Sequence, residues 1–319
     1  MEAFVTMLRN VIVFVALAVP GFLLVKTGQL KTEQSGALSK LLMYVGMPFL
    51  ILSGTINNLS FNKELLLILV TTALVGAAYI FLTFFLSKPL TAGGSPEKTR
   101  GMMRFCAVFA NNGFLGIPLA VAVFGADSLV FTVLMVLNII NNVLMYTLGA
   151  YLTTGDKKNI SVKKAFLNPV LAAFVLGCIC NLLGVKKYVP EVITFSDHFS
   201  NVVTPISMTI IGMKLGATSF KTLFSSGKLY YVSLLKLALF PIAVTAAMFA
   251  LKGFAGTLPV ESIILGVFVA FSMPTAGLSA TFADEFGGDT ENAVIFTLGT
   301  TVLSVLTIPT LYWLLNLFI

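Results

Sequence analysis

Two apolar stretches of the chain carry polar side chains next to glycine and proline. Residues 104–124 contain Asn111-Asn112-Gly113 and, shortly after, Gly116-Ile117-Pro118. Residues 266–283 contain Ser272-Met273-Pro274-Thr275-Ala276-Gly277. Proline removes a helical hydrogen bond and glycine lets the backbone turn, so each stretch predicts a helix that is broken near its centre. Amide and hydroxyl groups beside such a break are typical of a site that binds a solute.

The two prolines predict where the second half of each broken helix starts. Proline is favoured at the first position of a helix, so Pro118 and Pro274 are each expected to begin a half-helix. If the two stretches cross the membrane in opposite directions, both half-helices point their positive N-terminal ends at one central region, which favours an anion, especially a carboxylate. The alternative is two kinked helices that only pack against each other. The candidate binding residues at the breaks are Asn111, Asn112, Gly113, Pro118, Ser272, Pro274 and Thr275.

A second polar group lies downstream, where Asn138, Asn141 and Asn142 share one face of a predicted helix. Asparagine inside a membrane either joins helices together or lines a pathway, and we keep Asn138 and Asn142 as candidate substrate contacts. Lys236 is the only charged residue expected well inside a helix. Its amine can contact the substrate or extend to the interface, and both readings stay open.

The remaining chemistry of the sequence is limited. None of the thirteen Asp and Glu residues falls in the middle of an expected helix, which disfavours proton coupling through a mid-membrane carboxylate. The only histidine, His198, is expected at a helix start outside the membrane. No phosphate-binding loop, catalytic triad or metal cluster is present, so we expect no enzyme activity and no cofactor. Na+ or H+ as a coupling ion, and uniport, remain open.

The composition identifies an integral membrane protein. Hydrophobic residues make up 57% and charged residues 10% of the 319 residues, whereas about a quarter of the residues in soluble domains are charged. The formal charge of +7 comes from basic residues placed singly near helix ends, so we expect no nucleic-acid partner. Cys106, Cys178 and Cys180 lie in apolar spans and are interpreted as packing residues. The first apolar stretch lacks a cleavage site and is expected to be a retained helix.

Charge, Gly, Pro and Asn divide the chain into ten expected membrane helices. Their ranges are 6–27, 37–57, 64–87, 100–124, 128–153, 165–184, 198–218, 228–251, 259–284 and 290–316. The odd-numbered loops carry fourteen Lys and Arg residues and the opposite side carries five. The positive-inside rule then places the odd loops in the cytoplasm and both termini outside.

The two halves of the chain resemble each other. Phe124-Gly125-Ala126-Asp127 and Phe286-Gly287-Gly288-Asp289 follow the two broken stretches at the same offset. A unit of five helices that is duplicated must insert upside down, so residues 1–155 and 156–319 are predicted to be inverted repeats. Paired interruptions at matching positions of two such halves point to the binding site of a secondary transporter.

The motif Asn111-Asn112-Gly113-Phe114-Leu115-Gly116-Ile117-Pro118-Leu119, with Pro274-Thr275-Ala276, Asn168-Pro169 and Met47-Pro48, resembles the auxin efflux carrier family in its compact bacterial form. The resemblance covers essentially the whole chain. It implies an all-α, sodium/proton antiporter-like fold of ten helices in which helices 4 and 9 are broken and cross, related to bile acid sodium symporters. It also implies a scaffold domain from helices 1, 2, 6 and 7 and a transport domain from helices 3–5 and 8–10.

The expected function is a secondary transporter or facilitator in the plasma membrane for a small organic anion, such as malate, malonate or an auxin-like carboxylate. The fifth loop, from Thr154 to Lys164, is short, which disfavours auxin itself as the physiological substrate. The alternatives are a sodium-coupled symporter of a larger amphipathic anion and, from another class, a receptor or a channel. The expected partners are the carboxylate and the lipid bilayer, and a homodimer stays open.

Overall fold

The fold is described here from a computed structural model, which describes residues 2–59, 62–156, 158, 160, 163, 168–254 and 258–318. Within these residues the named elements are all helices, and two short extended segments pair in an isolated β-bridge. The α-helices are α1 (Glu2–Lys26), α2 (Ser35–Leu41), α3 (Met47–Asn58), α4 (Lys63–Leu90), α5 (Glu97–Val108), α6 (Ile117–Phe124), α7 (Leu129–Leu144), α8 (Ala150–Thr154), α10 (Pro169–Leu182), α11 (Val185–Tyr188), α12 (Glu191–Ser200), α13 (Val203–Ala217), α14 (Phe220–Ser225), α15 (Gly227–Leu234), α16 (Phe240–Leu251), α17 (Val260–Ser272), α18 (Ser279–Phe286) and α19 (Thr290–Leu315). The π-helical turns are Leu42–Gly46, Asn112–Gly116, Met145–Gly149 and Leu235–Leu239.

The lengths of the helices show how many of them could cross a membrane. Six helices of the described chain are long and apolar enough to cross a membrane: Val5–Lys26, Thr32–Asn58, Lys63–Leu90, Leu129–Thr153, Gly227–Leu251 and Thr290–Leu315. Shorter apolar helices cover Asn112–Phe124, Pro169–Leu182 and Val260–Ser272. The protein is therefore a helical integral membrane protein, while ten spans and an inverted repeat stay predictions.

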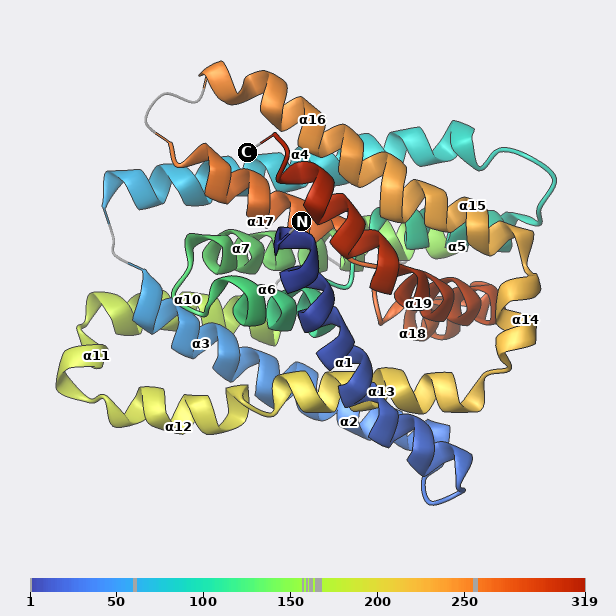
Figure 1. Cartoon of the computed structure of the whole chain (residues 1–319), viewed down its shortest axis with the longest axis horizontal. Helices are drawn as coiled ribbons and strands as arrows, with labels where there is room; N and C mark the ends of the chain where they lie inside the picture. The colour runs from blue at the N-terminus through green and yellow to red at the C-terminus, as the bar shows by residue number, and fades with distance from the viewer. Residues whose placement is uncertain are drawn as a thin grey trace.

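The helices form two groups in space (Figure 1). Helices α1–α3 and α10–α13 lie in one half of the view, and α4, α5 and α15–α19 in the other, with α6 and α7 between them. Within the first group α1 packs along α13 and α3 packs along α10, while in the second α7 packs against α17 and α4. The first group is called the lower group below, after its place in Figure 1.

Helices α1 and α13 meet at their backbones. A Cβ atom at Gly212 of α13 would overlap the carbonyl oxygen of Ala18 in α1, and one at Gly21 of α1 would overlap the carbonyl oxygen of Thr209 in α13. Small residues at a helix crossing let the two backbones approach, which is the usual basis of helix association in lipid. This pair is therefore tightly fixed.

The pair of α3 and α10 is held by packing and by a side-chain cap. A Cβ at Gly177 of α10 would lie 2.7 Å from Cβ of Thr55 in α3. The amide nitrogen of Asn181 donates to the carbonyl oxygens of Ile56 and Leu59, at 2.9 and 2.7 Å. Since the last carbonyls of a helix have no partner within the helix, Asn181 satisfies the end of α3.

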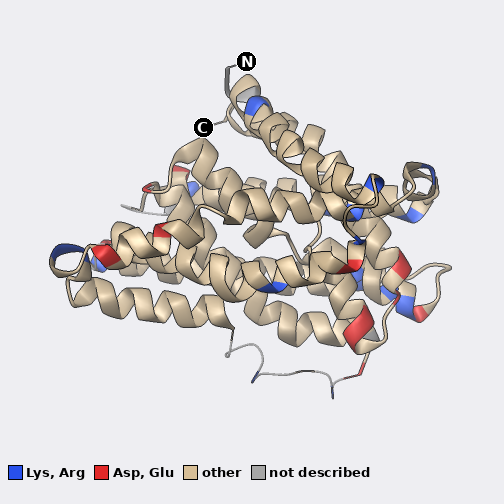
Figure 2. Ribbon diagram, turned by 90° about the horizontal axis from the view of Figure 1, so that it is seen from below, with Lys and Arg blue, Asp and Glu red and all other residues tan. Residues whose placement is uncertain are grey.

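Charged residues lie mainly toward the two ends of the helical bundle, and its middle is largely uncharged (Figure 2). At one end, Asp289 caps α19 by accepting from the Asn292 N–H at 3.1 Å, and it also accepts from the Thr99 hydroxyl at 2.5 Å. Burial raises the pKa of Asp289, but the hydrogen bonds from Thr99 and Asn292 lower it by more than burial raises it. The pKa of Asp289 therefore lies below its ordinary value. The cap thus links the start of α19 to α5.

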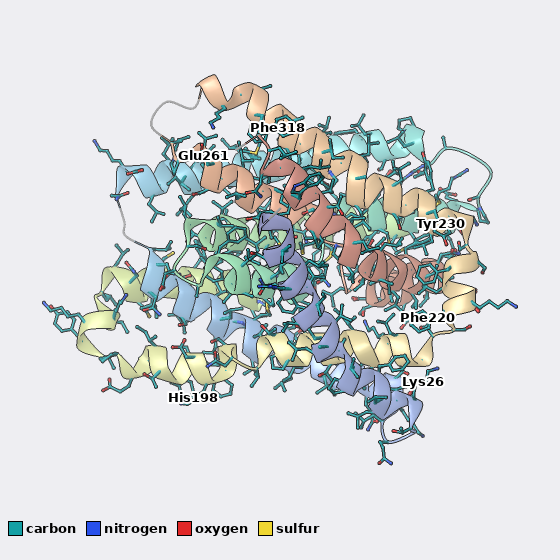
Figure 3. All side chains as sticks on the ribbon, viewed as in Figure 1. Lys26, His198, Phe220, Tyr230, Glu261 and Phe318 are labelled. Atoms are coloured by element: carbon teal, nitrogen blue, oxygen red, sulfur yellow. The ribbon has the colours of Figure 1, made fainter. Side chains whose placement is uncertain are left out.

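The predicted helix 198–218 is wrong in its boundaries. The structure has two helices there, α12 and α13, and His198 lies in the last turn of α12 instead of at a helix start. Figure 3 places His198 at the periphery of the bundle. Lys214 is one of the fourteen basic residues that the charge count assigned to the odd-numbered loops, and it lies in the last turn of α13. Lys157 and Lys164 of the fifth loop lie outside the described residues.

Candidate functional site

Two helices end inside the bundle. Helix α5 stops at Val108 and α17 stops at Ser272, and the residues that follow them, Phe109 and Met273, have extended backbones. Both breaks lie in the apolar stretches where the sequence predicted them. The predicted discontinuity of the two helices is therefore present in the structure.

The extended residues after α5 and α17 pair with each other in an antiparallel β-bridge. The N–H of Asn111 donates to the carbonyl oxygen of Pro274 at 2.8 Å, and the N–H of Ala276 donates to the carbonyl oxygen of Phe109 at 3.0 Å. An unpaired backbone group inside a membrane costs roughly several kcal/mol. Each break leaves such groups without helical partners, and the hydrogen bonds between the two breaks satisfy them. We call residues 109–111 and 273–278 together the crossing, and refer to them as its first and second strand.

Side chains from neighbouring helices hold the crossing in place. The Asn141 amide of α7 accepts from the Ala110 N–H at 3.2 Å and donates to the Ala110 carbonyl at 3.1 Å. On the other strand the Thr300 hydroxyl of α19 accepts from the Thr275 N–H at 3.1 Å. The amide at position 141 matters because it carries a donor and an acceptor on one planar group, so a single side chain binds both the N–H and the C=O of Ala110.

A further set of hydroxyl groups binds the second strand to α5 and α19. The Thr275 hydroxyl donates to the carbonyl oxygen of Cys106 at 2.9 Å. Ser279, the first residue of α18, shares a hydrogen bond with the Thr297 hydroxyl. All four residues are buried, so the second strand is fixed on the side away from solvent.

The helices beyond the crossing begin at positions that differ from the prediction. Pro274 does not begin a half-helix: it lies in the extended strand, and α18 starts only at Ser279. Pro118 lies in the first turn of α6, but the π-helical turn Asn112–Gly116 precedes it, so the helical segment begins at Asn112. The pairing with residues 109–111 thus delays the second helix beyond Pro274, whereas the first resumes earlier than predicted.

A cavity of about 660 Å³ opens onto the crossing, and we call it the crossing cavity. Its lining combines the crossing, α7, the lower group and two charged residues toward the odd-numbered loops. These residues are Met43, Tyr44, Met47, Ala110, Asn111, Gly113, Phe114, Asn138, Asn141, Asn142, Met145, Tyr146, Lys163, Asn168, Pro169, Val170, Ala276, Gly277, Leu278 and Glu285. Polar amides thus face a wall rich in methionine and aromatic side chains.

Amide groups that line this cavity, and the buried amide of Asn112 next to it in the chain, have unused hydrogen-bonding capacity. Asn142 donates to the carbonyl and side-chain oxygens of Asn138, at 2.8 and 3.0 Å. The side-chain nitrogen of Asn138 and both side-chain polar atoms of Asn112 are buried without a partner in the protein. Buried polar groups are nearly always hydrogen-bonded, so these atoms indicate a partner such as water or a solute.

The candidate residues from the sequence separate into three places. Four of them line the crossing cavity: Asn111, Gly113, Asn138 and Asn142. Five are buried and do not line it: Asn112, Ser272, Pro274, Thr275 and Lys236. Pro118 lines a different cavity.

That second cavity has a volume of about 340 Å³ and lies between α3, α6, α12 and α13. Its lining includes Asn58, Asp127 and Asn201, which lie at or near the even-numbered loops. We therefore call it the even-loop cavity. Inside it the Ser53 hydroxyl donates to the Asp197 carboxylate at 2.6 Å. Cavities thus approach the centre of the molecule from both ends.

Sequence reasoning missed Lys214 as a neighbour of the crossing. Its amine lies 3.4 Å from the carbonyl oxygen of Gly277, and a Cβ at Gly277 would lie 3.6 Å from the Asn111 amide nitrogen. Nothing in the sequence distinguishes a lysine in the last turn of a helix, three residues before its end at Ala217, from a lysine in the following loop. Within the described residues, no group of three or more His, Cys, Asp or Glu side chains is placed to hold a metal ion.

Comparisons with known proteins relate the chain to membrane transporters. A family model described as membrane transport protein matches residues 5–312. The chain is 27% identical over 305 residues to an uncharacterized transporter of Methanothermobacter thermautotrophicus, covering 94% of this chain and 96% of the relative. It is also 27% identical over 221 residues to an uncharacterized transporter of Methanocaldococcus jannaschii, covering 66% of this chain and 70% of the relative.

Proposed function

The chain belongs to the auxin efflux carrier family of membrane transport proteins, and from this premise we propose that it moves a small organic carboxylate across the plasma membrane by alternating access. The observation that carries the proposal is the crossing cavity, which ends on Asn111 beside the first residues of two helices. Helix N-termini and amide donors are suited to an anion. Malate, malonate and auxin-like carboxylates are the candidate substrates.

The proposed binding mode follows from which groups are free to donate. The carboxylate lies at the crossing between the Asn111 amide and the start of the helical segment at Asn112, while Asn138 and Asn142 bind its polar substituents. The unpartnered side-chain nitrogen of Asn138, which lines the cavity, supports this arrangement, since it lacks an acceptor in the protein. Gly113 allows the Asn138 side chain to lie close to the backbone at residue 113, because a Cβ at Gly113 would lie 3.4 Å from the Asn138 side-chain oxygen.

The proposed movement is that of a transport domain against a scaffold. The scaffold consists of expected helices 1, 2, 6 and 7 and the transport domain of expected helices 3–5 and 8–10. The packing of α1 on α13 and of α3 on α10 supports the first unit, and the packing of α7 on α17 and α4, with α15 on α19, supports the second. The same pairings are expected of inverted repeats, residues 1–155 and 156–319.

Alternating access is supported by the positions of the two cavities. The crossing cavity reaches Lys163 and Glu285 on the side of the odd-numbered loops, which the charge rule assigns to the cytoplasm. The even-loop cavity lies on the other side, along Pro118 of α6. Movement of α6 and α7 against α3 would close one cavity and open the other.

The test is uptake of radiolabelled malate, malonate and indole-3-acetate into proteoliposomes, with and without Na+ and pH gradients. We expect saturable flux of at least one carboxylate that is competed by other carboxylates. Dependence on one gradient identifies Na+ or H+ as the coupling ion, and flux without either identifies uniport. Current through single channels, or flux that does not saturate, would contradict a carrier, and ligand binding without flux would indicate a receptor.

A sodium-coupled symporter of a larger amphipathic anion is the second candidate. The wall of Met43, Met47, Met145, Tyr44 and Phe114 favours it, because flexible and aromatic side chains suit an apolar ligand body. Flux of an amphipathic anion that depends strictly on external Na+, with no flux of malate or malonate, would favour this candidate over the first.

A further inference from the structure

A cavity of about 240 Å³ lies between helices of the lower group and the helices beyond the crossing. Helices α1 and α13 form one wall, and α19 together with Leu115 and Leu119 forms the other. The lining has two hydroxyl groups, on Thr301 and Ser304, and each donates to a carbonyl oxygen within α19 at 2.7 Å. All other lining side chains are apolar, so we call this space the apolar cavity.

The apolar cavity lies at the depth of the hydrocarbon core of the expected membrane. Val11, Phe14 and Val15 line it from the middle of α1, whose span Val5–Lys26 is of bilayer length. Val15 is 45% exposed, so the cavity is accessible from the outside of the bundle. Water would need several polar partners to fill this space, and an empty space would deprive the lining of dispersion contacts. An alkyl chain from the bilayer has neither disadvantage.

A positive charge lies beyond one end of the apolar cavity. Phe220 lines the cavity, and its ring centroid lies 6.5 Å from that of Phe22 in α1. The amine of Lys26, in the last turn of α1, lies 5.8 Å from the centroid of the Phe22 ring. Figure 3 shows Lys26 and Phe220 at the same edge of the bundle. Lys26 is exposed and forms no ion pair with an Asp or Glu among the described residues.

The spacing along α1 matches the dimensions of a lipid. Eleven positions separate Val15 from Lys26, which is a rise of about 16 Å along a helix. The hydrocarbon half of a bilayer is about 15 Å thick. An acyl chain that reaches Val15 therefore has its headgroup at the level of Lys26, where a lysine attracts anionic lipids.

We propose that the apolar cavity binds one acyl chain of an anionic phospholipid whose phosphate lies beside the Lys26 amine. The chain lies between α1 and α13 on one side and α19 on the other, across the boundary between the two proposed domains. This site is separate from the crossing cavity: Gly113 and Phe114 line the crossing cavity, whereas Leu115 and Leu119 line the apolar cavity. Lipid binding needs no transported solute, so the proposal does not rest on the proposed function.

The first test is thermal unfolding of the purified full-length protein in mild detergent, with phosphatidylglycerol or phosphatidylcholine of identical acyl chains. A ligand that binds only the folded state raises apparent stability. The wild type is expected to melt several degrees higher with phosphatidylglycerol than with phosphatidylcholine. Lys26→Gln is expected to need about fivefold more phosphatidylglycerol for the same rise, which is the effect of one lysine at an anionic surface. Lys88→Gln, which removes an exposed lysine from the last turn of α4, is the matched control and should behave as the wild type.

The second test locates the acyl chain. Phosphatidylglycerol with a diazirine in its acyl chain is photocrosslinked to the protein, and the modified peptides are identified by mass spectrometry. We expect crosslinks in residues 11–18 and 301–308 of the wild type. Val305→Phe narrows the apolar cavity and should reduce these crosslinks several-fold. Leu306→Phe, at the next position of α19, is 68% exposed and outside the lining, so it should leave them unchanged.

The proposal is wrong if both lipids raise the melting temperature of the wild type equally, or if Lys88→Gln has the same effect as Lys26→Gln. Crosslinks confined to other helices would also overturn it, as would equal crosslinking of Val305→Phe and the wild type. If Val305→Phe does not fold, the wild-type crosslinks and Lys26→Gln decide. A lack of carboxylate flux would count against the proposed function alone, because both tests are made without a transported solute.

Discussion

The backbone N–H of Asn111 donates to the carbonyl oxygen of Pro274, which lies 163 positions later in the chain, at 2.8 Å. Both residues lie after the helix that precedes them has ended, α5 at Val108 and α17 at Ser272, so these two backbone groups pair with each other. The bond therefore ties the position of the Asn111 amide, which lines the crossing cavity, to the strand from the other half of the chain. Five predictions follow from this arrangement and its supports.

Asn141 is predicted to hold the first strand through both faces of its amide. Asn141→Asp keeps the acceptor for the Ala110 N–H but cannot donate to the Ala110 carbonyl, and it adds a buried charge. We expect a loss of about 1–3 kcal/mol in stability, since one buried partner is left unsatisfied, together with a loss of flux. Chemical denaturation measures the first effect. Asn10→Ala, which removes an amide from α1, is the control and should leave both quantities unchanged.

Gly54 is predicted to control the balance between two conformations. A Cβ there would lie 2.7 Å from the Phe131 ring, where α3 meets α7, so Gly54→Ala should disfavour the present conformation by about 1–3 kcal/mol. We expect faster labelling of Ser200→Cys, in the even-loop cavity, by a membrane-impermeant maleimide. Cys178 and Cys180 are replaced by Ala, and Gly36→Ala serves as the control because nothing lies within 4 Å of its Cβ position. Unchanged labelling would argue against movement at this contact.

Gly212 is predicted to be essential for the pair of α1 and α13. Its added Cβ would meet backbone atoms of Ala18, which cannot move as a side chain can. Gly212→Ala should therefore reduce stability by about 1–3 kcal/mol or more. The melting temperature of Gly36→Ala provides the comparison. Equal melting temperatures for the two variants would show that the helices separate easily.

Asp289 is predicted to stabilise the start of α19 in a pH-dependent way. Its pKa in the folded protein is depressed, so its contribution is complete above the unfolded value of about 3.9 and disappears as the pH falls through the folded value. Asp289→Asn should thus lower the melting temperature at neutral pH, and the difference from the wild type should shrink in acid. Asp284→Asn, which removes an exposed acid of α18, is the control. A difference that is constant with pH would contradict the prediction.

The sequence predicted that two apolar helices break, because proline and glycine in a span of bilayer length leave few other readings. It did not predict where the halves resume. Pro274 matches the preference for a helix start, yet its carbonyl is used by Asn111, so the strand continues to Ser279. Local preference alone cannot foresee a partner from the other half of the chain.

The supporting residues were harder to predict than the break. Asn141 was recognised as one of three asparagines on a helix face. Its two hydrogen bonds to the Ala110 backbone, however, depend on how α7 packs on the crossing. Lys236 was expected to reach either the substrate or the interface, and the structure encloses it instead. The short helices α11 and α12 follow Gly184 and Pro190, which read as loop residues in the sequence.

The most direct test of the account is saturable carboxylate flux into proteoliposomes by the wild type and by Asn111→Ala, with Asn10→Ala as the control. A charge-assisted hydrogen bond contributes about 1.5–3 kcal/mol, so we expect the KM of Asn111→Ala to rise about tenfold to a hundredfold while the protein melts close to the wild-type temperature. A KM equal to that of the wild type would place the anion away from the crossing and contradict the account.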